Sequence, residues 1–349
     1  MRSGNTAGAT NVDYATFDGS ASERSDYITS LGTLRFAADE TEKTIRVLIV
    51  DDAFVEGFEG LTLTLSNSTD GIVLGATSSI ALTIVDNDAT PTSANPIDTT
   101  EFFVRQQYLD FLNRQPDAAG LAFWSNVLNN QMAECNSQPA GEQRNRCISF
   151  ARVRVSAAFF LSIEFQETGF LVIRYFRGAL GRQPDFREFL RDTQEMQRGV
   201  VIGQPGALAL LEANTVRVTQ EFVSRPEFVA RYPQGSPAAT YVDALYASEG
   251  VTPSASERNQ AIAAYGSGDT AGRAAALRVA ANNSQFRNRE FRPAFVLMQY
   301  FGYLRRDPDD AGFNFWLNKL NEFNGNYEAA EMVRAFILST EYRSRFGQP

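Results

Sequence analysis

Residues 114–124 read Arg-Gln-Pro-Asp-Ala-Ala-Gly-Leu-Ala-Phe-Trp, and residues 306–316 read Arg-Asp-Pro-Asp-Asp-Ala-Gly-Phe-Asn-Phe-Trp. Seven of the eleven positions are identical, and the two stretches contain both tryptophans of the chain. A near-verbatim repeat indicates a structural module, because repeats build scaffolds and binding surfaces more often than active sites. The repeat therefore predicts an array of similar units over the last two-thirds of the chain.

Apolar side chains on both sides of the repeat recur at helical spacing and predict two helices that meet at a corner. These side chains are Val104, Tyr108, Phe111, Leu112, Leu121, Trp124, Val127 and Leu128. Pro116 ends the first helix, because proline lacks the amide hydrogen that a helix interior needs, and Asp117 is placed to cap the second. We expect Trp124 and Trp316 to be core anchors, with a binding role as the alternative.

Weaker copies of this corner predict four helical-bundle modules. The corner prolines are Pro116, Pro184, Pro253 and Pro308. Each copy closes on a serine that precedes an aromatic residue and can cap a short helix, at Ser162, Ser224, Ser284 and Ser339. The predicted modules, of which the third is the most degenerate, cover residues 101–168, 169–235, 236–292 and 293–349.

The first 89 residues follow a period of two instead. Short runs rich in β-branched residues alternate with glycine, asparagine, aspartate and serine, and they predict strands at Thr10–Phe17, Leu31–Phe36, Lys43–Val50, Leu61–Leu65 and Ser79–Val85. This spacing is typical of an antiparallel β-sandwich over residues 1–89. Residues 90–100 are rich in proline, threonine and serine, which predicts an exposed, semi-rigid linker.

The net charge of −9 is confined to the N-terminal segment. Residues 1–100 contain 15 acidic and 5 basic residues, whereas the remainder of the chain is nearly balanced. Acidic residues follow the ends of predicted strands, and carboxylates that cluster there favour a hard cation such as calcium. Ordinary turn-forming aspartate is the alternative. The acidic balance argues against a nucleic-acid partner.

Cys135 and Cys147, the two cysteines of the chain, lie 12 positions apart in a polar stretch. They predict a disulfide that closes one surface loop of an exported protein, and two free thiols are the alternative. The chain contains no histidine, which excludes Ser-His-Asp and Cys-His catalytic arrangements and makes zinc a poor fit. We therefore expect a protein that is not an enzyme.

No apolar run approaches the length of a membrane span, and the first residues do not begin a signal peptide. Disulfides persist in oxidising compartments, so the predicted one favours an extracellular or cell-surface location. We expect that any targeting segment has been removed or lies upstream.

Several motifs in the first 89 residues resemble the Calx-beta domain in order and spacing. They are Ser-Asp-Tyr at 25–27, Gly-Thr-Leu-Arg-Phe at 32–36, Asp-Asp at 51–52 with Glu56 and Glu59, Leu-Ser-Asn at 65–67 and Thr-Ile-Val-Asp-Asn-Asp at 83–88. The resemblance implies a seven-stranded immunoglobulin-like antiparallel sandwich, and some family members bind calcium at one tip. Carried over by position, the ligands are Asp26, Asp51, Asp52, Glu56, Asp86 and Asp88.

This chain departs from the Calx-beta pattern at its start. The family begins with a further strand before the Arg-Ser-Gly-Asn stretch, which here occupies residues 2–5. A fragment or a misplaced start codon explains the difference. The alternative is that a neighbouring subunit supplies the strand by β-augmentation and so joins subunits into a polymer.

The helical corner and the closing Phe-Leu-Ser-Ile-Glu-Phe at 160–165 resemble the bacterial helical domain of unknown function 4214. That family is common in large exported proteins, often beside calcium-binding or adhesive modules. The resemblance implies a location and a domain context, and it implies no activity.

Together these observations predict a multidomain chain, all-β and then all-α, that acts as a non-enzymatic exported structural protein. We expect it to self-associate as a homo-oligomer or polymer in an extracellular filament, surface layer or matrix. A calcium-dependent adhesin that binds glycans is the alternative. An accessory region of a larger secreted enzyme is a third interpretation.

Overall fold

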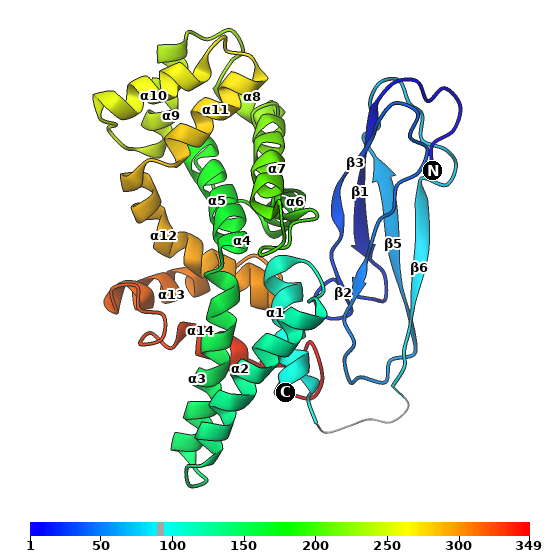
Figure 1. Cartoon of the computed structure of the whole chain (residues 1–349), viewed down its shortest axis with the longest axis vertical. Coiled ribbons are helices and arrows are strands. Elements are labelled where there is room, and N and C mark those ends of the chain that lie inside the picture. The colour runs from blue at the N-terminus through cyan, green and yellow to red at the C-terminus, as the bar shows by residue number, and fades with distance from the viewer. Residues whose placement is uncertain (89–93) are drawn as a thin grey trace. The chain divides into compact units, whose positions relative to one another are not determined.

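The computed structural model describes residues 1–88 and 94–349, and it places an antiparallel β-domain (residues 1–88) before a series of helices (Figure 1). The described residues form two compact units. Unit 1 contains residues 1–160, 302–306 and 331–349. Unit 2 contains residues 161–301 and 307–330. The fold class is therefore the predicted one, β first and then helical.

The main sheet of the β-domain has four antiparallel strands in the order β3-β1-β5-β6. Their bounds are Thr10–Asp18 for β1, Leu31–Phe36 for β3, Phe58–Ser66 for β5 and Ser79–Val85 for β6. Alternate side chains of β1 and β3 form the core of one end, because successive side chains of a strand point to opposite faces. These core residues are Val12, Tyr14, Leu34 and Phe36.

The second sheet is much shorter than the sequence predicts. It pairs β2 (Tyr27–Ile28) with β4 (Leu48–Ile49). Only two residues of the predicted strand Lys43–Val50 therefore form backbone hydrogen bonds with another strand. Ile45 and Val47 still pack against the main sheet. The period-two pattern of residues 43–50 correctly indicated which side of this segment faces the core. Backbone pairing also requires a partner strand, and β2 supplies only two residues for it.

Unit 1 contains the first predicted helical corner. Its helices are η1 (Pro96–Asp98), α1 (Thr100–Leu112), α2 (Ala118–Asn136), α3 (Glu142–Phe160), α14 (Met332–Leu338) and α15 (Thr340–Arg343). Asp117 caps α2 as predicted, since its carboxylate accepts a hydrogen bond from the Gly120 amide at 2.9 Å. A disulfide joins Cys135 to Cys147 and so ties α2 to α3, with the two Cα atoms 5.5 Å apart.

The tryptophans of the repeat are not core residues, which corrects the prediction of core anchors. Trp124 is half-buried and packs on Phe159, with ring centroids 5.5 Å apart. Trp316 is half-buried too. Both lie in the helix that follows the corner. The core positions belong to Leu128 and Leu320, one turn further along each helix and at most 1% exposed.

The predicted linker is partly a packed segment. Residues 89–93 lie outside the described residues, whereas residues 95–98 pack within unit 1. The Asn95 side-chain amide donates to the carbonyl oxygens of Arg343 and Gln348, both at 3.0 Å. Ile97 is 1% exposed. These contacts bind the start of the helical region to the C-terminal residues, which corrects the expectation of an exposed spacer there.

Unit 2 is helical throughout. It contains α4 (Ile163–Phe165), η2 (Gln166–Phe170), α5 (Leu171–Tyr175), η3 (Phe176–Leu180), α6 (Phe186–Gln197), α7 (Ala207–Phe222), α8 (Pro226–Arg231), α9 (Ala238–Glu249), α10 (Ala255–Tyr265), α11 (Thr270–Ala281), α12 (Ser284–Gln299) and α13 (Asp310–Glu322), and η4 (Tyr300–Leu304) follows α12. The predicted module boundaries after residues 168 and 292 fall inside η2 and α12. The helices therefore run through these two boundaries.

The closing serines act as caps in two of the four predicted modules. Ser162 and Ser339 accept hydrogen bonds from the amides of Phe165 and Tyr342. In the third module Asn283 is the cap instead, and in the second α8 begins at Pro226 with no side-chain cap bond. Among the described helices, none combines the length and the apolar content that crossing a bilayer requires.

We predict that the double substitution C135A/C147A lowers the stability of unit 1. Losing the crosslink restores chain entropy to the unfolded state, which costs about 3 kcal/mol for a loop of this length. Thermal unfolding measures the effect, and a reducing agent should lower the midpoint of the wild type while leaving the variant unchanged. Equal midpoints for the oxidised wild type and the variant would contradict a structural role for the disulfide.

Candidate metal centre at the tip of the β-domain

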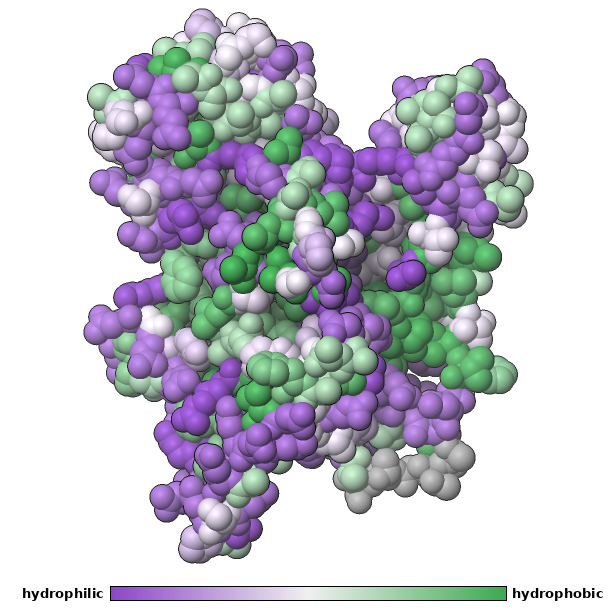
Figure 2. Space-filling model, in the orientation of Figure 1, coloured by the Kyte–Doolittle hydropathy of each residue, from purple (hydrophilic) through white to green (hydrophobic). Residues whose placement is uncertain are grey.

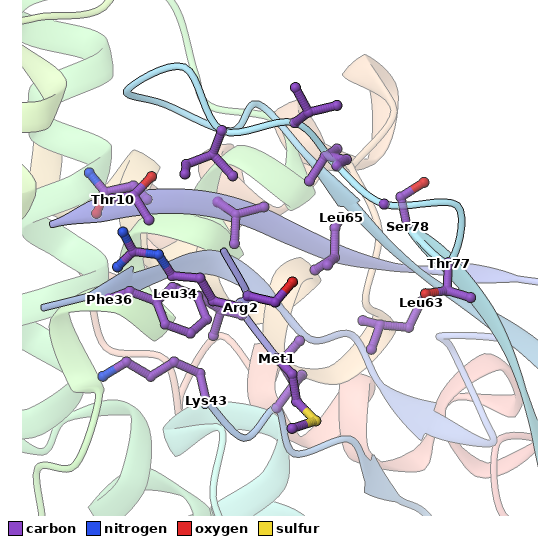
Figure 3. Close-up of a pocket in the computed structure, with 18 of the residues that line it drawn as sticks. Met1, Arg2, Thr10, Leu34, Phe36, Lys43, Leu63, Leu65, Thr77 and Ser78 are labelled. Atoms are coloured by element: carbon purple, nitrogen blue, oxygen red, sulfur yellow. The ribbon is translucent and has the colours of Figure 1, made fainter. Parts of the chain in front are cut away.

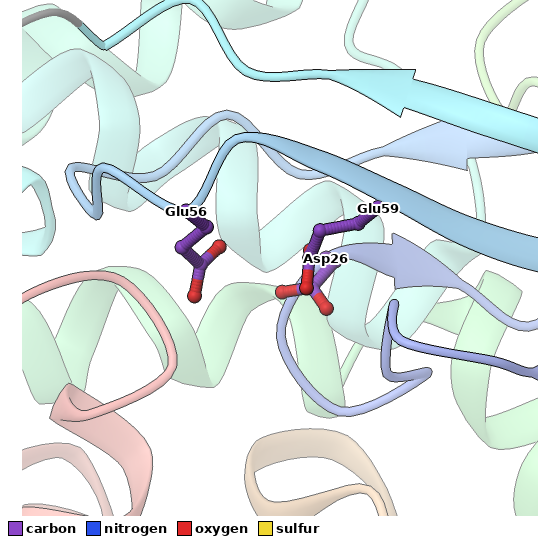
Figure 4. Close-up of side chains that lie close together, drawn as sticks. All are labelled: Asp26, Glu56 and Glu59. Carbon is purple, nitrogen blue, oxygen red and sulfur yellow. The ribbon is translucent and has the colours of Figure 1, made fainter.

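Three carboxylates converge at the end of the β-domain where β5 begins (Figure 4). Asp26 directly precedes β2, Glu56 precedes β5 by two residues, and Glu59 is the second residue of β5. Each offers an oxygen that lies within 4.8 Å of the others. The pairing of Asp18 with Leu61 explains this meeting, because it brings the end of β1, and the loop after it, beside the start of β5.

Asp26 is the fixed member of the group. Its side chain is 6% exposed, and its Oδ2 accepts a hydrogen bond from the Ser22 amide at 2.6 Å. Its own amide donates to the Ser22 carbonyl at 2.9 Å, so residues 22–26 form a single closed turn. The Asp26 carbonyl accepts from the Val50 amide, which anchors this turn to the loop after β4.

Repulsion and burial raise the pKa values of the neighbouring acids. Burial, and then the charges of Asp26 and Glu56, raise the pKa of Glu59 to about 7. Burial also raises the pKa of Asp52 to about 7, although the Phe54 amide bound to its carboxylate opposes the shift. The pKa of Glu56 is raised by burial and by the charge of Asp26. Such a group gains stability from a proton or a cation.

The other predicted ligands hold the loops together. Asp86 accepts hydrogen bonds from the amides of Glu56, Gly57 and Asp88, and these backbone bonds lower its pKa. Asp51 accepts from the Asn87 side chain at 3.1 Å. Asp88 adds its charge to the electrostatic environment of Asp52. Of the six predicted ligands, Asp26 and Glu56 therefore lie together, and Asp52 is close enough for their charges to affect its pKa. Asp51 and Asp86 instead hold the surrounding turns through hydrogen bonds.

Glu59 was absent from the predicted ligand set. It lies two positions before Leu61, which is 2% exposed, and strand periodicity places both side chains on the inner face of β5. Extending the alternation of β5 back from Leu61 would have found it. The donors of Asp26, Glu56 and Glu59 are all carboxylate oxygens, the ligands of a hard cation, and calcium takes six to eight such oxygens. Loop carbonyls and water would complete that number.

Comparisons with known proteins agree with the two domain types. Residues 1–88 match the family model of the Calx-beta domain. Residues 88–136 and 281–346 match the family described as domain of unknown function (DUF4214). Both resemblances are therefore confirmed. The second DUF4214 match begins before residue 293, in agreement with the continuous helix α12.

Two curated relatives each match a quarter of the chain or less. Sodium/calcium exchanger 1 of Mus musculus is 38% identical over an alignment of 104 residues, and the match covers 25% of this chain and 11% of the exchanger. Sodium/calcium exchanger 2 of Rattus norvegicus is 45% identical over 64 residues, which is 18% of this chain and 7% of the exchanger. The chain thus spans about a tenth of the length of these relatives.

Two solved structures each match a quarter of this chain. A crystal structure of the calcium binding domain CBD12 of CALX1.1 is 30% identical, with a TM-score of 0.25 over 25% of this chain and 37% of that one. The apo-form Calx CBD1 domain is 29% identical, with a TM-score of 0.24 over 25% of this chain and 76% of that one.

With divalent cations chelated, we predict that the β-domain loses stability as the pH rises from about 4.5 to about 7. The folded-state pKa of Glu59 is about 7 against an ordinary value of 4.5, so the folded state retains a proton that the unfolded chain has released. Raising the pH across this window therefore favours unfolding. Thermal unfolding of the wild type and of E59Q measures the dependence, which should be weaker in E59Q. Stability that increases across this window in the wild type would contradict the prediction.

Proposed function

We propose that this protein is a calcium-binding, non-enzymatic structural subunit of an extracellular assembly. The observation that carries the proposal is the convergence of Asp26, Glu56 and Glu59 at the tip of a domain that matches the Calx-beta family. The shared segment in sodium/calcium exchangers supports calcium as the cation. The disulfide supports a location in an oxidising compartment, and a sequence without histidine supports a role without catalysis.

An open cleft lined by both apolar and polar residues supports association of this domain with a second copy. The cleft has a volume of about 600 Å³ and lies on the main sheet, with Leu34, Phe36, Leu63 and Leu65 in its wall (Figure 3). Two further lining residues are exposed, Ile80 of β6 at 55% and Val73 at 89%. Figure 2 shows apolar side chains over the part of the β-domain that carries β6. Apolar surface of this kind favours burial against a partner.

The occupant that we propose is a β-strand from a second copy. Among the described strands β6 is an edge of the main sheet, and an edge presents unpaired backbone groups to an added strand. The second sheet pairs only two residues of β2 with two of β4, so its strands also have backbone groups that an added strand could pair with. An added strand would pair with such an edge and place alternate side chains over the cleft. Repetition of this contact would join subunits into a filament, surface layer or matrix.

A groove in unit 2 favours glycan binding as a second candidate function. It measures about 460 Å³ and is lined by polar side chains that include Glu257, Gln260, Arg278 and Asn282. Carboxylate, amide and guanidinium groups together can donate to and accept from sugar hydroxyls. Glycan-array binding that is lost in Q260A, with the oligomeric state unchanged, would support an adhesin.

We predict that the 349-residue chain binds calcium and that D26N and E59Q each weaken binding at least tenfold. Each substitution removes one of the negative charges that a hard cation requires. Isothermal titration calorimetry measures the affinity. D39N is the matched control, because Asp39 lies at the other end of the main sheet. It follows Phe36, which pairs with the first residue of β1, whereas the acidic cluster lies near the last residue, Asp18. Calcium affinity that is unchanged in both cluster variants would contradict this site.

We also predict that the wild type self-associates with increasing concentration and that I80K shifts it toward monomer. A lysine at this exposed position places a charge on the edge where the added strand would dock. Sedimentation velocity with and without calcium measures the distribution. L208K is the matched control, since Leu208 is a 63% exposed apolar residue of α7 in unit 2. A wild type that stays monomeric at high concentration under both conditions would refute self-association.

A further inference from the structure

Two loops that surround the acidic cluster are hydrogen-bonded to the helical part of unit 1. The first loop is residues 22–26, which ends in Asp26, and the second is residues 51–54, which contains Asp52. Three groups make these bonds: the guanidinium groups of Arg305 and Arg345 and the carbonyl of Phe346. We refer to these three groups as the clamp.

Arg345 is held in place before it reaches the β-domain. Its guanidinium pairs with the Asp110 carboxylate of α1 at 3.0 Å and donates to the Tyr303 carbonyl at 2.7 Å. The remaining donor, Nε, reaches the Arg24 carbonyl at 2.6 Å. Arg345 is 4% exposed, so these bonds are shielded from water. The contacts with Asp110 and Tyr303 therefore fix the Arg345 guanidinium, and its bond to the Arg24 carbonyl fixes the turn that carries Asp26.

Arg305 contacts the same turn one residue earlier. Its Nε donates to the Glu23 carbonyl at 2.8 Å, and its Nη2 donates to the Thr29 hydroxyl at 3.3 Å. Thr29 in turn donates to the Glu23 carboxylate at 2.8 Å. Arg305 is 2% exposed. The two arginines thus bind consecutive carbonyl groups of the turn whose first amide holds the Asp26 carboxylate.

The second loop is bound through its backbone. The Ala53 amide donates to the Phe346 carbonyl at 3.0 Å. The neighbouring Asp52 accepts from the Phe54 amide at 2.8 Å, so its side chain belongs to the same tight turn. Phe346 is fully buried, with its ring 5.3 Å from that of Phe102 and 5.2 Å from that of Tyr342. Its carbonyl is therefore a fixed acceptor.

We infer that the clamp positions the calcium ligands, so that the helical region of unit 1 sets the calcium affinity of the β-domain. The inference rests on the proposed calcium site. A cation binds more tightly when its ligands need no further ordering, and the clamp orders the turns of Asp26 and Asp52 in advance. Coupling between two equilibria is reciprocal. Calcium must therefore strengthen the docking of the β-domain on the helices by the same factor.

The test compares calcium affinity in variants of the 349-residue chain. R305M removes the bonds to Glu23 and Thr29, while R345K keeps a positive charge beside Asp110 and loses the bond to Arg24. We expect each to weaken calcium binding by roughly 5- to 150-fold, the usual range of coupling between sites. Isothermal titration calorimetry measures the affinity, and circular dichroism at the same temperature checks that each variant is folded.

The matched control is R273M in unit 2. Arg273 is 3% exposed and donates to two consecutive backbone carbonyls, those of Tyr232 and Pro233, as Arg305 and Arg345 together do for Glu23 and Arg24. Its loss should lower thermal stability and leave calcium affinity unchanged. A general loss of stability would instead weaken binding in all three variants, and that outcome would overturn the inference.

The reciprocal measurement uses the wild type and needs no variant. Hydrogen exchange at the Ala53 amide reports on the bond to Phe346, and calcium should slow this exchange. If wild-type protein binds calcium while exchange at Ala53 is unchanged and the clamp variants keep wild-type affinity, the inference fails and the calcium site stands. If the wild type binds no calcium, the proposed site and the clamp inference fail together.

Discussion

The buried ion pair between Arg345 and Asp110 is the contact on which unit 1 depends. The pair is 3.0 Å long, and at most 5% of either side chain is exposed. Removing two charges from water is costly unless the remaining donors are satisfied. Arg345 meets this condition by also donating to the carbonyls of Tyr303 and Arg24. One side chain thus joins α1, the segment after α12, the C-terminal residues and the β-domain.

Because of this contact, the β-domain is one part of a larger unit that includes helices. The loops that bear Asp26 and Asp52 have one side on the acidic cluster and the other on helical residues. A cation at the cluster and the docking of the helices therefore act on the same backbone. This arrangement gives a physical reason for the β-domain and these helices to occur in one compact unit.

Local features of this fold were predictable from the sequence, and long-range ones were not. The cap formed by Asp117 and the β-rich runs follow from neighbouring residues, so their patterns are readable. The strand predicted at Lys43–Val50 shortened because a ladder depends on a partner from elsewhere in the chain. The alternation of β5 places Glu59 on the inner face, but its position beside Asp26 depends on the pairing of β1 with β5, which no local pattern reports. The pairing of Asp110 with Arg345 spans 235 positions and leaves no periodic signal.

A crystal structure of the 349-residue chain, grown with calcium, tests the central claim most directly. The account predicts an ion bound by oxygens of Asp26, Glu56 and Glu59 at 2.3–2.6 Å, the usual calcium–oxygen distance. It also predicts that the bond between the Ala53 amide and the Phe346 carbonyl is intact in that crystal. Water alone among these carboxylates, at a calcium concentration far above that of the protein, would contradict the account.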